Sequence, residues 1–234
     1  MIPQNCFIFL LKTCLFLSIC KEQIQPSQTS IEEVTEIAIY AIAQEKNQAF
    51  KPLLQSFQQQ ISQLEGFKDY QTLQAIETSN IYVDLVRWER LDLALAASDA
   101  VKHQAQFQPF VKVIDSLILY REFYPFQSFI HQKNKNMQDK VTEVVIYKIK
   151  SDKVSEYTDI ANSANTFLSQ QSGFIKRDIL QDHKTPNIFM DIVLWENIDA
   201  AQQAMQLAQQ TPSLAPFFEA TEEIVSFSHY QHFK

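Results

Sequence analysis

The hydrophobic residues of this chain follow strand and helix periods in turn, and the same order of elements occurs in both halves. Apolar residues within 50–64 recur at steps of three and four, the spacing of one face of an amphipathic helix. The first half is predicted to hold strand 36–43, helix 50–64, strand 67–76, strand 81–89, helix 91–103 and strand 116–124. The second half is predicted to hold strand 143–149, helix 155–170, strand 174–181, strand 188–196, helix 199–209 and strand 224–232.

The two halves are copies of one another. Segment 80–89 recurs as 187–196, at an offset of 107 residues (187 − 80) that needs no insertion elsewhere. The only two glycines of the chain, Gly66 and Gly173, lie at the same position of the repeat, and Gly66 is expected to end the preceding helix. A unit of this length is a small domain rather than a solenoid repeat. We therefore predict a tandem duplication, with repeats at 34–124 and 141–234 and a linker at 125–140.

The third strand of each repeat carries one acidic residue on an otherwise apolar face. Side chains alternate along a strand, so one face is formed by every second residue. This face holds Tyr82, Asp84, Val86 and Trp88 in the first copy and Phe189, Asp191, Val193 and Trp195 in the second. A buried carboxylate is unfavourable unless it is paired or hydrogen-bonded. The carboxylate of each copy therefore has two possible roles. It lies in a ligand cavity beside an aromatic wall, where burial raises its pKa, or it is a hydrogen-bonded part of the core.

The first strand also keeps two polar residues in both copies. Glu36 and Tyr40 share one face of this strand and return as Glu143 and Tyr147. The tyrosine hydroxyl either donates to a ligand or the aspartate, or packs at the rim of the core. The copies differ elsewhere: Tyr82 corresponds to Phe189, Arg87 to Leu194 and Tyr70 to Arg177. If two cavities exist, we therefore expect them to differ.

The order β-α-β-β-α-β within each copy is that of the ferredoxin-like unit. Residues at particular places in this unit resemble the antibiotic-biosynthesis-monooxygenase family of the dimeric α/β barrel superfamily. They are Gly66-Phe67, Asn80, Trp88-Glu89, Asp92-Leu93-Ala94 and Phe110, with Gly173-Phe174, Asn187, Trp195-Glu196, Asp199-Ala200-Ala201 and Phe217 in the second copy. The resemblance implies an α+β fold in which two ferredoxin-like repeats form an intramolecular dimeric α/β barrel.

The resemblance also implies an activity. Quinone-forming monooxygenases of this family work without a cofactor and carry Asn-x-x-x-Trp on the third strand, where this chain has Asp84-x-x-x-Trp88 and Asp191-x-x-x-Trp195. We therefore predict a monooxygenase-like protein that acts on a small aromatic or quinol-type compound and needs no cofactor. Asp84 and Asp191 are the candidate bases. The candidate substrate-binding residues are Trp88, Trp195, Tyr40, Tyr147, Tyr82 and Phe189.

Composition narrows the range of partners. The net charge of −7 and the absence of a basic stripe make nucleic acid an unexpected partner. No GxGxxG pattern occurs, which argues against a glycine-rich phosphate loop. The histidines are scattered and the cysteines all fall within 1–20, so we expect no metal site and no disulfide in the repeats. Because both repeats lie on one chain, we expect a monomeric pseudo-dimer.

The first 20 residues are mostly apolar and resemble a secretory signal. Residues 17–20 resemble a bacterial lipobox, in which Cys20 would carry the lipid, and 21–33 form a polar tether. Export, to the periplasm or as a lipoprotein, is therefore favoured, with membrane contact only through such an anchor. The alternative is a cytoplasmic protein whose start has been assigned too early.

Two other functional hypotheses remain open. The chain is either a non-catalytic barrel that binds a small molecule, or a structural α/β barrel whose duplicated residues only form a core. An open cavity lined by both Asp and Trp distinguishes a ligand site from a purely structural core.

Overall fold

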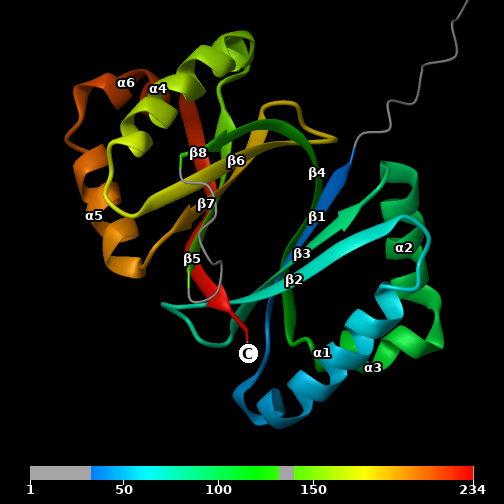
Figure 1. Cartoon of the computed structure of the whole chain (residues 1–234). Helices are drawn as coiled ribbons and strands as arrows, with labels where there is room; N and C mark the ends of the chain where they lie inside the picture. Colours follow the sequence, from blue (N-terminus) through cyan, green and yellow to red (C-terminus); the bar gives the residue numbers. More distant parts are fainter. Residues whose placement is uncertain (1–32, 132–139, 234) are drawn as a thin grey trace, which may run out of the picture. The chain divides into compact units, whose positions relative to one another are not determined.

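The computed structural model describes residues 33–131 and 140–233 (Figure 1). The first repeat contains β1 (Val34–Ala41), α1 (Asn47–Ile61), β2 (Phe67–Ala75), β3 (Ile81–Trp88), α2 (Leu91–His103), α3 (Gln108–Val113) and β4 (Ser116–Ile130). The second contains β5 (Val141–Ile149), α4 (Tyr157–Ser169), β6 (Phe174–Asp182), β7 (Ile188–Trp195), α5 (Ile198–Ala208), α6 (Ala215–Ala220) and β8 (Thr221–His232). The predicted signal segment 1–20, most of the predicted tether 21–33 and the centre of the predicted linker 125–140 lie outside the described residues.

The hydrophobic pattern does not predict the short helix that precedes the last strand of each repeat. Pro109 lies in the first turn of α3, and Pro216 holds the equivalent place in α6. Proline is compatible with that turn, because the first N–H groups of a helix have no partner within the helix. Phe110 is therefore helical and packs in the core of the first repeat.

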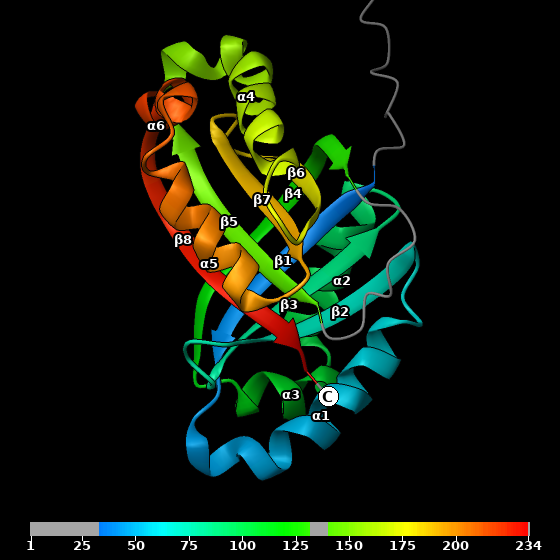
Figure 2. The same cartoon turned by 60° about the vertical axis from the view of Figure 1, so that its left-hand side comes forward.

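The strands form one closed antiparallel barrel in the order β1-β3-β2-β8-β5-β7-β6-β4. Each repeat supplies four neighbouring strands, and the repeats meet where β2 pairs with β8 and β4 pairs with β6. Helices α1, α2 and α3 cover the outer face of the first repeat's strands, and α4, α5 and α6 cover those of the second (Figure 1 and Figure 2). The predicted pair of ferredoxin-like repeats in an intramolecular α/β barrel is confirmed.

Alternation along the strands divides the apolar residues between the barrel interior and the helices. The interior cluster includes Ile37, Ile39, Val83, Leu85, Ile146 and Met190. The intervening residues of β1 and β3 pack with the helices, as Tyr40, Tyr82, Val86 and Trp88 do. Asp84 shares this second face, so its carboxylate lies outside the barrel and beneath the helices.

Both glycines are required by the backbone and by close packing. Gly66 and Gly173 have φ angles of 77° and 81°, a region that other residues rarely adopt. A Cβ atom would also collide with Leu93 at the first site and come within 2.6 Å of Ala200 Cβ at the second. Helix α1 ends at Ile61, so Gly66 lies in the turn into β2 rather than at the helix end where the pattern placed it.

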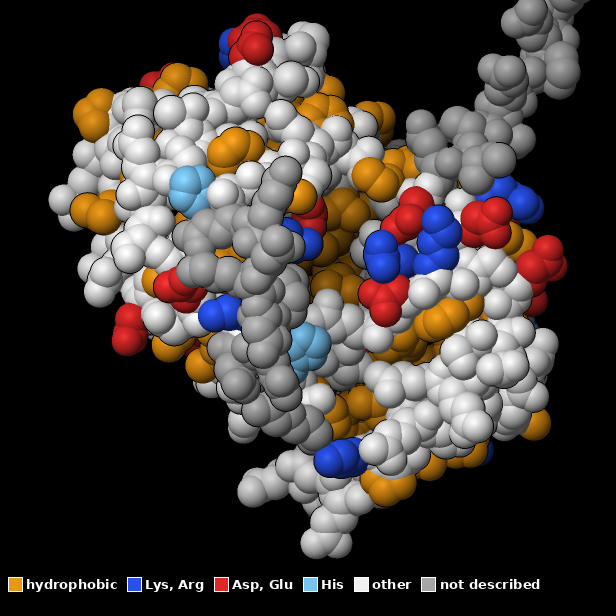
Figure 3. Space-filling model, in the orientation of Figure 1, with side chains coloured by type: hydrophobic (Ala, Val, Ile, Leu, Met, Phe, Trp, Pro, Cys, Tyr) orange, Lys and Arg blue, Asp and Glu red, His pale blue; other side chains and the backbone are white. Residues whose placement is uncertain are grey.

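One end of the barrel interior opens as a cavity of about 590 Å³. Leu85, Leu180 and Ile192 contribute apolar wall, and Arg87 at the rim pairs with Glu33 and Asp69. In Figure 3 this region is a hollow with hydrophobic side chains at its bottom and charged side chains beside it. The charged groups of the rim are thus largely neutralised by one another.

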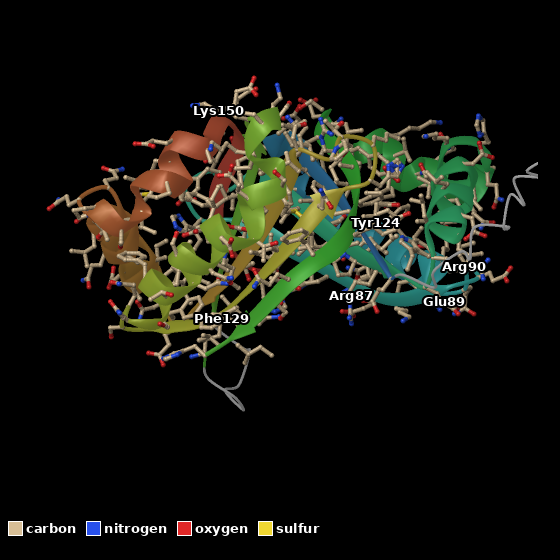
Figure 4. The ribbon with its side chains drawn as sticks, turned by 90° about the horizontal axis from the view of Figure 1, so that it is seen from above. Arg87, Glu89, Arg90, Tyr124, Phe129 and Lys150 are labelled. Carbon is tan, nitrogen blue, oxygen red and sulfur yellow. The ribbon has the colours of Figure 1, made fainter. Side chains whose placement is uncertain are left out.

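The two junctions between the repeats differ in length. β2 and β8 pair at three positions, from Leu73↔His232 to Ala75↔Tyr230, whereas β4 and β6 pair at seven, from Phe123↔Asp182 to Ile130↔Lys176. The second junction is longer because β4 continues past its predicted end at residue 124. Tyr124 packs with the core of the first repeat and Phe129 with that of the second, so β4 spans both repeats (Figure 4).

Each junction carries an ion pair from the same two repeat positions, with the charges exchanged. Glu122 on β4 lies 3.7 Å from Lys184 Nζ. His229, its equivalent on β8, lies 2.6 Å from Glu77, the equivalent of Lys184. Pairing between two first repeats would place Glu122 near Glu77, two like charges. The charges therefore favour the pairing of unlike repeats.

The β2–β8 junction is expected to weaken at high pH. His229 Nδ1 lies 2.6 Å from Glu77 and its Nε2 lies 3.3 Å from Glu143. Burial opposes protonation of the ring, but the hydrogen bonds to Glu143 and Glu77 outweigh it and raise the pKa of His229 above 6.5. Its stabilisation is therefore complete below pH 6.5 and is lost as the pH rises through the folded-state pKa. We expect His229→Gln to cost about 1–3 kcal/mol at pH 6 and clearly less at pH 9.

Urea denaturation of both proteins at the two pH values measures this difference. His232→Gln is the matched control, because that histidine is exposed on the same strand and is not held between two carboxylates. An equal cost of His229→Gln at both pH values would show that the imidazole contributes packing rather than charge.

Candidate functional site

The outer face of the first repeat brings polar residues from four strands together. Ala38 of β1 is paired with Asp84 of β3 on one side and with Tyr120 of β4 on the other. Thr72 of β2 is the next neighbour of Asp84. Because alanine has the smallest side chain with a Cβ, it leaves room between the carboxylate and the tyrosine. Glu36 lies one step along the same face of β1.

A cavity of about 370 Å³ lies over this face, between the strands and helices α1, α2 and α3. Its volume is at the lower end of the usual range for ligand sites, about 300–1,000 Å³. Of the residues predicted for a site in the first repeat, Tyr40, Asp84 and Trp88 line it. Tyr82 does not: its ring packs against Phe50 at a centroid distance of 4.5 Å.

Asp84 is held inside this cavity, and no positively charged group among the described residues pairs with it. Its side chain accepts hydrogen bonds from Tyr70 Oη at 2.5 Å and from Thr72 Oγ1 at 2.6 Å. The residue is only 4% exposed. Burial disfavours the charged form more strongly than Thr72 and Tyr70 favour it, and raises the pKa of Asp84 to about 6. The carboxylate is therefore a base that is largely ionised at neutral pH.

Several other buried polar atoms of the cavity wall make no hydrogen bond of good geometry within the described residues, although Tyr40 lies close to Asp84 and Tyr120 lies close to Glu36. They are Glu36 Oε2, Tyr40 Oη, Trp88 Nε1 and Tyr120 Oη. Burial raises the pKa of Glu36 to about 7: the Tyr120 hydroxyl opposes this shift, and the nearby charges of Glu122 and Asp84 reinforce it. Unpaired buried polar groups are unfavourable. A ligand that offers hydrogen-bonding oxygens could satisfy them.

The second repeat builds a cavity of about 290 Å³ from the same repeat positions, but its carboxylate is neutralised. Arg177, which replaces Tyr70, contacts Asp191 Oδ2 through Nη2 at 2.7 Å and through Nε at 2.9 Å. Tyr147 donates to Asp191 Oδ1 at 2.9 Å and also contacts the hydroxyl of Tyr157. Asp191 therefore belongs to a buried ion pair.

Other replacements make the second cavity more apolar. Ala38, Thr72 and Tyr120 of the first repeat correspond to Val145, Ile179 and Phe227. Glu143, the copy of Glu36, lies 3.3 Å from His229. Among the described residues of this wall, Trp195 Nε1 is the buried polar atom left without a hydrogen bond. Trp195 and Tyr147 line the cavity, as predicted for a site, whereas Phe189 packs against Tyr157 and does not. The expected difference between the two cavities is thus observed.

The sequence pattern indicated some of these residues and missed others. Glu36 was recognisable, because it recurs with Tyr40 on one face of the first strand in both copies. The exchange of Tyr70 for Arg177 was visible as a difference between the copies, but not the ion pair that it creates. Thr72 and Tyr120 had no signal in the sequence, because only the strand register brings them beside Asp84 and Ala38.

The described residues show neither a metal cluster nor a membrane-spanning helix. Within 33–131 and 140–233, no group of three or more His, Cys, Asp and Glu side chains is placed to hold a metal ion. None of the helices in these ranges is long and apolar enough to cross a membrane.

Comparison with known proteins supports the fold and the family resemblance. Residues 141–215, most of the second repeat, match the model of the antibiotic biosynthesis monooxygenase family. The resemblance stated from the sequence is therefore confirmed for this region. No curated protein matches the chain in sequence.

Several solved structures share the fold at low sequence identity. An anthrone oxidase-like protein is 13% identical with a TM-score of 0.68, covering 88% of this chain and 93% of its own. A candidate monooxygenase from Fusobacterium nucleatum is 12% identical with a TM-score of 0.62, covering 88% and 94%. A chlorite dismutase from Candidatus Nitrospira defluvii is 8% identical with a TM-score of 0.62, covering 87% and 92%. Such likeness establishes a monooxygenase-like barrel fold.

Proposed function

We propose that the first-repeat cavity oxidises a small, flat phenol or quinol-type compound with molecular oxygen and without a cofactor, with Asp84 as the base. The observation that carries this proposal is the environment of Asp84. It is a buried carboxylate in the wall of a ligand-sized cavity, with a pKa raised to about 6 and no cationic partner within 33–131 and 140–233. The second repeat, where Arg177 neutralises the equivalent carboxylate, shows the arrangement that a structural role would produce.

In the proposed reaction the protein catalyses a proton transfer, and the deprotonated substrate then reacts with oxygen directly. Asp84 removes a proton from the hydroxyl group or from the enolisable C–H, which leaves an electron-rich anion. The anion reacts with oxygen at the ring carbon that becomes the new carbonyl. One oxygen atom stays on that carbon, and the other leaves as water with the two hydrogen atoms that the substrate loses. No external reductant is needed.

The remaining groups of the cavity fit the binding of such a ligand. The ring of Trp88 offers an aromatic surface for a flat substrate. The hydroxyls of Tyr40 and Tyr120 make no hydrogen bond of good geometry to a described residue and can donate to ligand oxygens, and Glu36 can accept a proton or a hydrogen bond at a second position. We assign Asp191, which the repeat pattern marked as a second base, to the ion pair with Arg177. Tyr147 and Trp195 are then parts of a non-catalytic cavity.

Oxygen uptake tests this function. Anthrone, the compound in the name of one structural neighbour, and 1-naphthol are suitable probes because each can lose a proton and gain one carbonyl oxygen. We expect one oxygen molecule consumed for each quinone formed, at a rate proportional to protein concentration. The measurement is made with an oxygen electrode while the quinone absorbance is followed.

A binding barrel without catalysis is the second candidate, and the apolar second cavity with its neutralised carboxylate favours it for that half. Two measurements distinguish the two functions. Ligand binding is measured without oxygen, by the quenching of tryptophan fluorescence, and oxygen uptake is measured in air. Quenching without oxygen uptake in air would support the binding function and contradict the proposed oxidation. Absence of both would contradict a site for this class of compound.

A further inference from the structure

The rim of each cavity is apolar and exposed. In the first repeat Val111, Leu117 and Ile118 are 37%, 57% and 55% exposed. Their equivalents in the second repeat, Phe218, Ile224 and Val225, are 47%, 54% and 37% exposed. The same three positions thus present hydrophobic side chains to solvent beside both cavities, although the two cavities differ at their floors.

A β-bulge produces part of this rim. The pairing of β1 with β4 shifts between Ile39 and Tyr40, so that Leu119 and Leu117 have partners on β1 and Ile118 has none. The pairing of β5 with β8 shifts at the equivalent place and leaves out Val225. A bulge re-aims side chains that would otherwise alternate. Here it coincides with two consecutive exposed apolar residues, Leu117 and Ile118.

The rim is continuous with the cavity wall. Val111 and Leu117 are exposed and also line the first cavity, and Phe218 and Ile224 do the same in the second. Lys102 and Asp115 also line the first cavity, and their opposite charges offset one another, which leaves Asp84 and Glu36 as its remaining ionisable carboxyl groups. The first cavity therefore combines polar groups around Asp84 with an apolar outlet to the surface.

We propose that the ligand of the first cavity is an amphiphile: a flat phenol or quinol head bound at Asp84 and Trp88, with an alkyl chain that leaves between Val111 and Leu117 and lies along Ile118. This inference rests on the proposed function for the identity of the head group. The chain accounts for the exposed apolar rim, because it would cover these side chains when the ligand is bound. A head group without a chain would leave them in water.

A series of hydroquinones with no chain, a butyl chain and an octyl chain tests the proposal. Binding is measured anaerobically by fluorescence of Trp88 in the full chain carrying Trp195→Phe, so that only the first cavity reports. We expect the affinity to increase about fourfold for each methylene group that the rim buries. Ile118→Asn should remove the increments contributed by the outer part of the chain and leave the affinity for unsubstituted hydroquinone unchanged. Val225→Asn, the equivalent change at the second cavity, should alter neither.

The possible results separate the two proposals. Equal affinity for all three compounds would contradict the proposal that the ligand carries an alkyl chain. Oxygen uptake that depends on Asp84 would still support the proposed function. Chain-dependent binding without any oxygen uptake would support the apolar outlet and contradict the oxidation. Light scattering that shows a dimer dissociated by Ile118→Asn would mean that the rim is covered by a second copy of the chain, and would overturn the proposal.

Discussion

Replacement of Arg177 by methionine is expected to lower the free energy of unfolding by about 3–5 kcal/mol. Arg177 is 1% exposed and Asp191 is 6% exposed, and their side chains are 2.7 Å apart. Arg177 also donates to the carbonyl oxygen of Ala161 and to Asn165 Oδ1. Without the guanidinium, the carboxylate would remain buried without a counter-charge, which is among the most destabilising changes in a protein interior.

The loss of stability caused by Arg177→Met should depend on pH. Burial already raises the pKa of Asp191, while Arg177 opposes this effect, so removal of Arg177 raises the pKa further. A carboxyl group whose pKa is raised by folding destabilises the folded state as the pH rises through that value. We therefore expect Arg177→Met to be least damaging near pH 4 and most damaging above neutrality, as measured by urea denaturation.

Two further variants make the interpretation specific. Arg177→Met combined with Asp191→Asn removes the buried charge and should recover most of the lost stability. Tyr70→Phe is the matched change in the first repeat; it removes one hydrogen bond to Asp84 and should cost only about 1–3 kcal/mol. If the double variant is as unstable as Arg177→Met, the loss comes from the packing of the arginine rather than from the isolated charge.

Much of the fold follows from local patterns, and the exceptions have a common cause. Apolar periodicity and the offset of the repeats were enough to order the main strands and helices, because these patterns are repeated in both halves. The extension of β4 was not predictable in the same way. Residues 125–130 begin with Pro125 and resemble a loop, but they pair with β6, and a register shift between Pro125 and Gln127 accommodates the proline. Only the partner strand from the other repeat makes this segment a strand.

The candidate site likewise contains residues that the strand pattern places and residues that only tertiary packing places. Period two along single strands was sufficient to place Asp84 and Trp88 on one face and Tyr40 with Glu36 on another strand's face. It also placed Tyr82 on the face of Asp84, but it could not identify the residues that pack against Tyr82. Tyr82 is covered by Phe50 and by Phe233, which comes from the end of the second repeat. Contacts of that kind depend on tertiary packing, so the pattern could not show that Tyr82 is absent from the cavity wall.

Asp84→Asn is expected to reduce turnover by a factor of about 10²–10⁴, if the first cavity carries the proposed oxidation. Asparagine keeps the shape of the side chain: its Oδ1 can accept from one of the two hydroxyls, Tyr70 or Thr72, and its Nδ2 can donate to the other, so folding should change little. It cannot take up the substrate proton. In the parent protein, kcat/KM should fall as the pH drops below about 6, because protonation of Asp84 removes the base.

Asp191→Asn is the matched variant, and it should give the opposite result. It leaves the buried guanidinium of Arg177 without its counter-charge, so we expect a loss of stability of about 3–5 kcal/mol. Turnover per folded molecule should be unchanged, because the carboxylate of Asp191 is already paired with Arg177 and takes no part in the proposed oxidation. Steady-state kinetics and urea denaturation of the two variants, side by side, measure both quantities. If both variants lose stability and neither loses turnover, the two aspartates are structural. If Asp191→Asn alone abolishes turnover, the base lies in the second repeat, despite the ion pair.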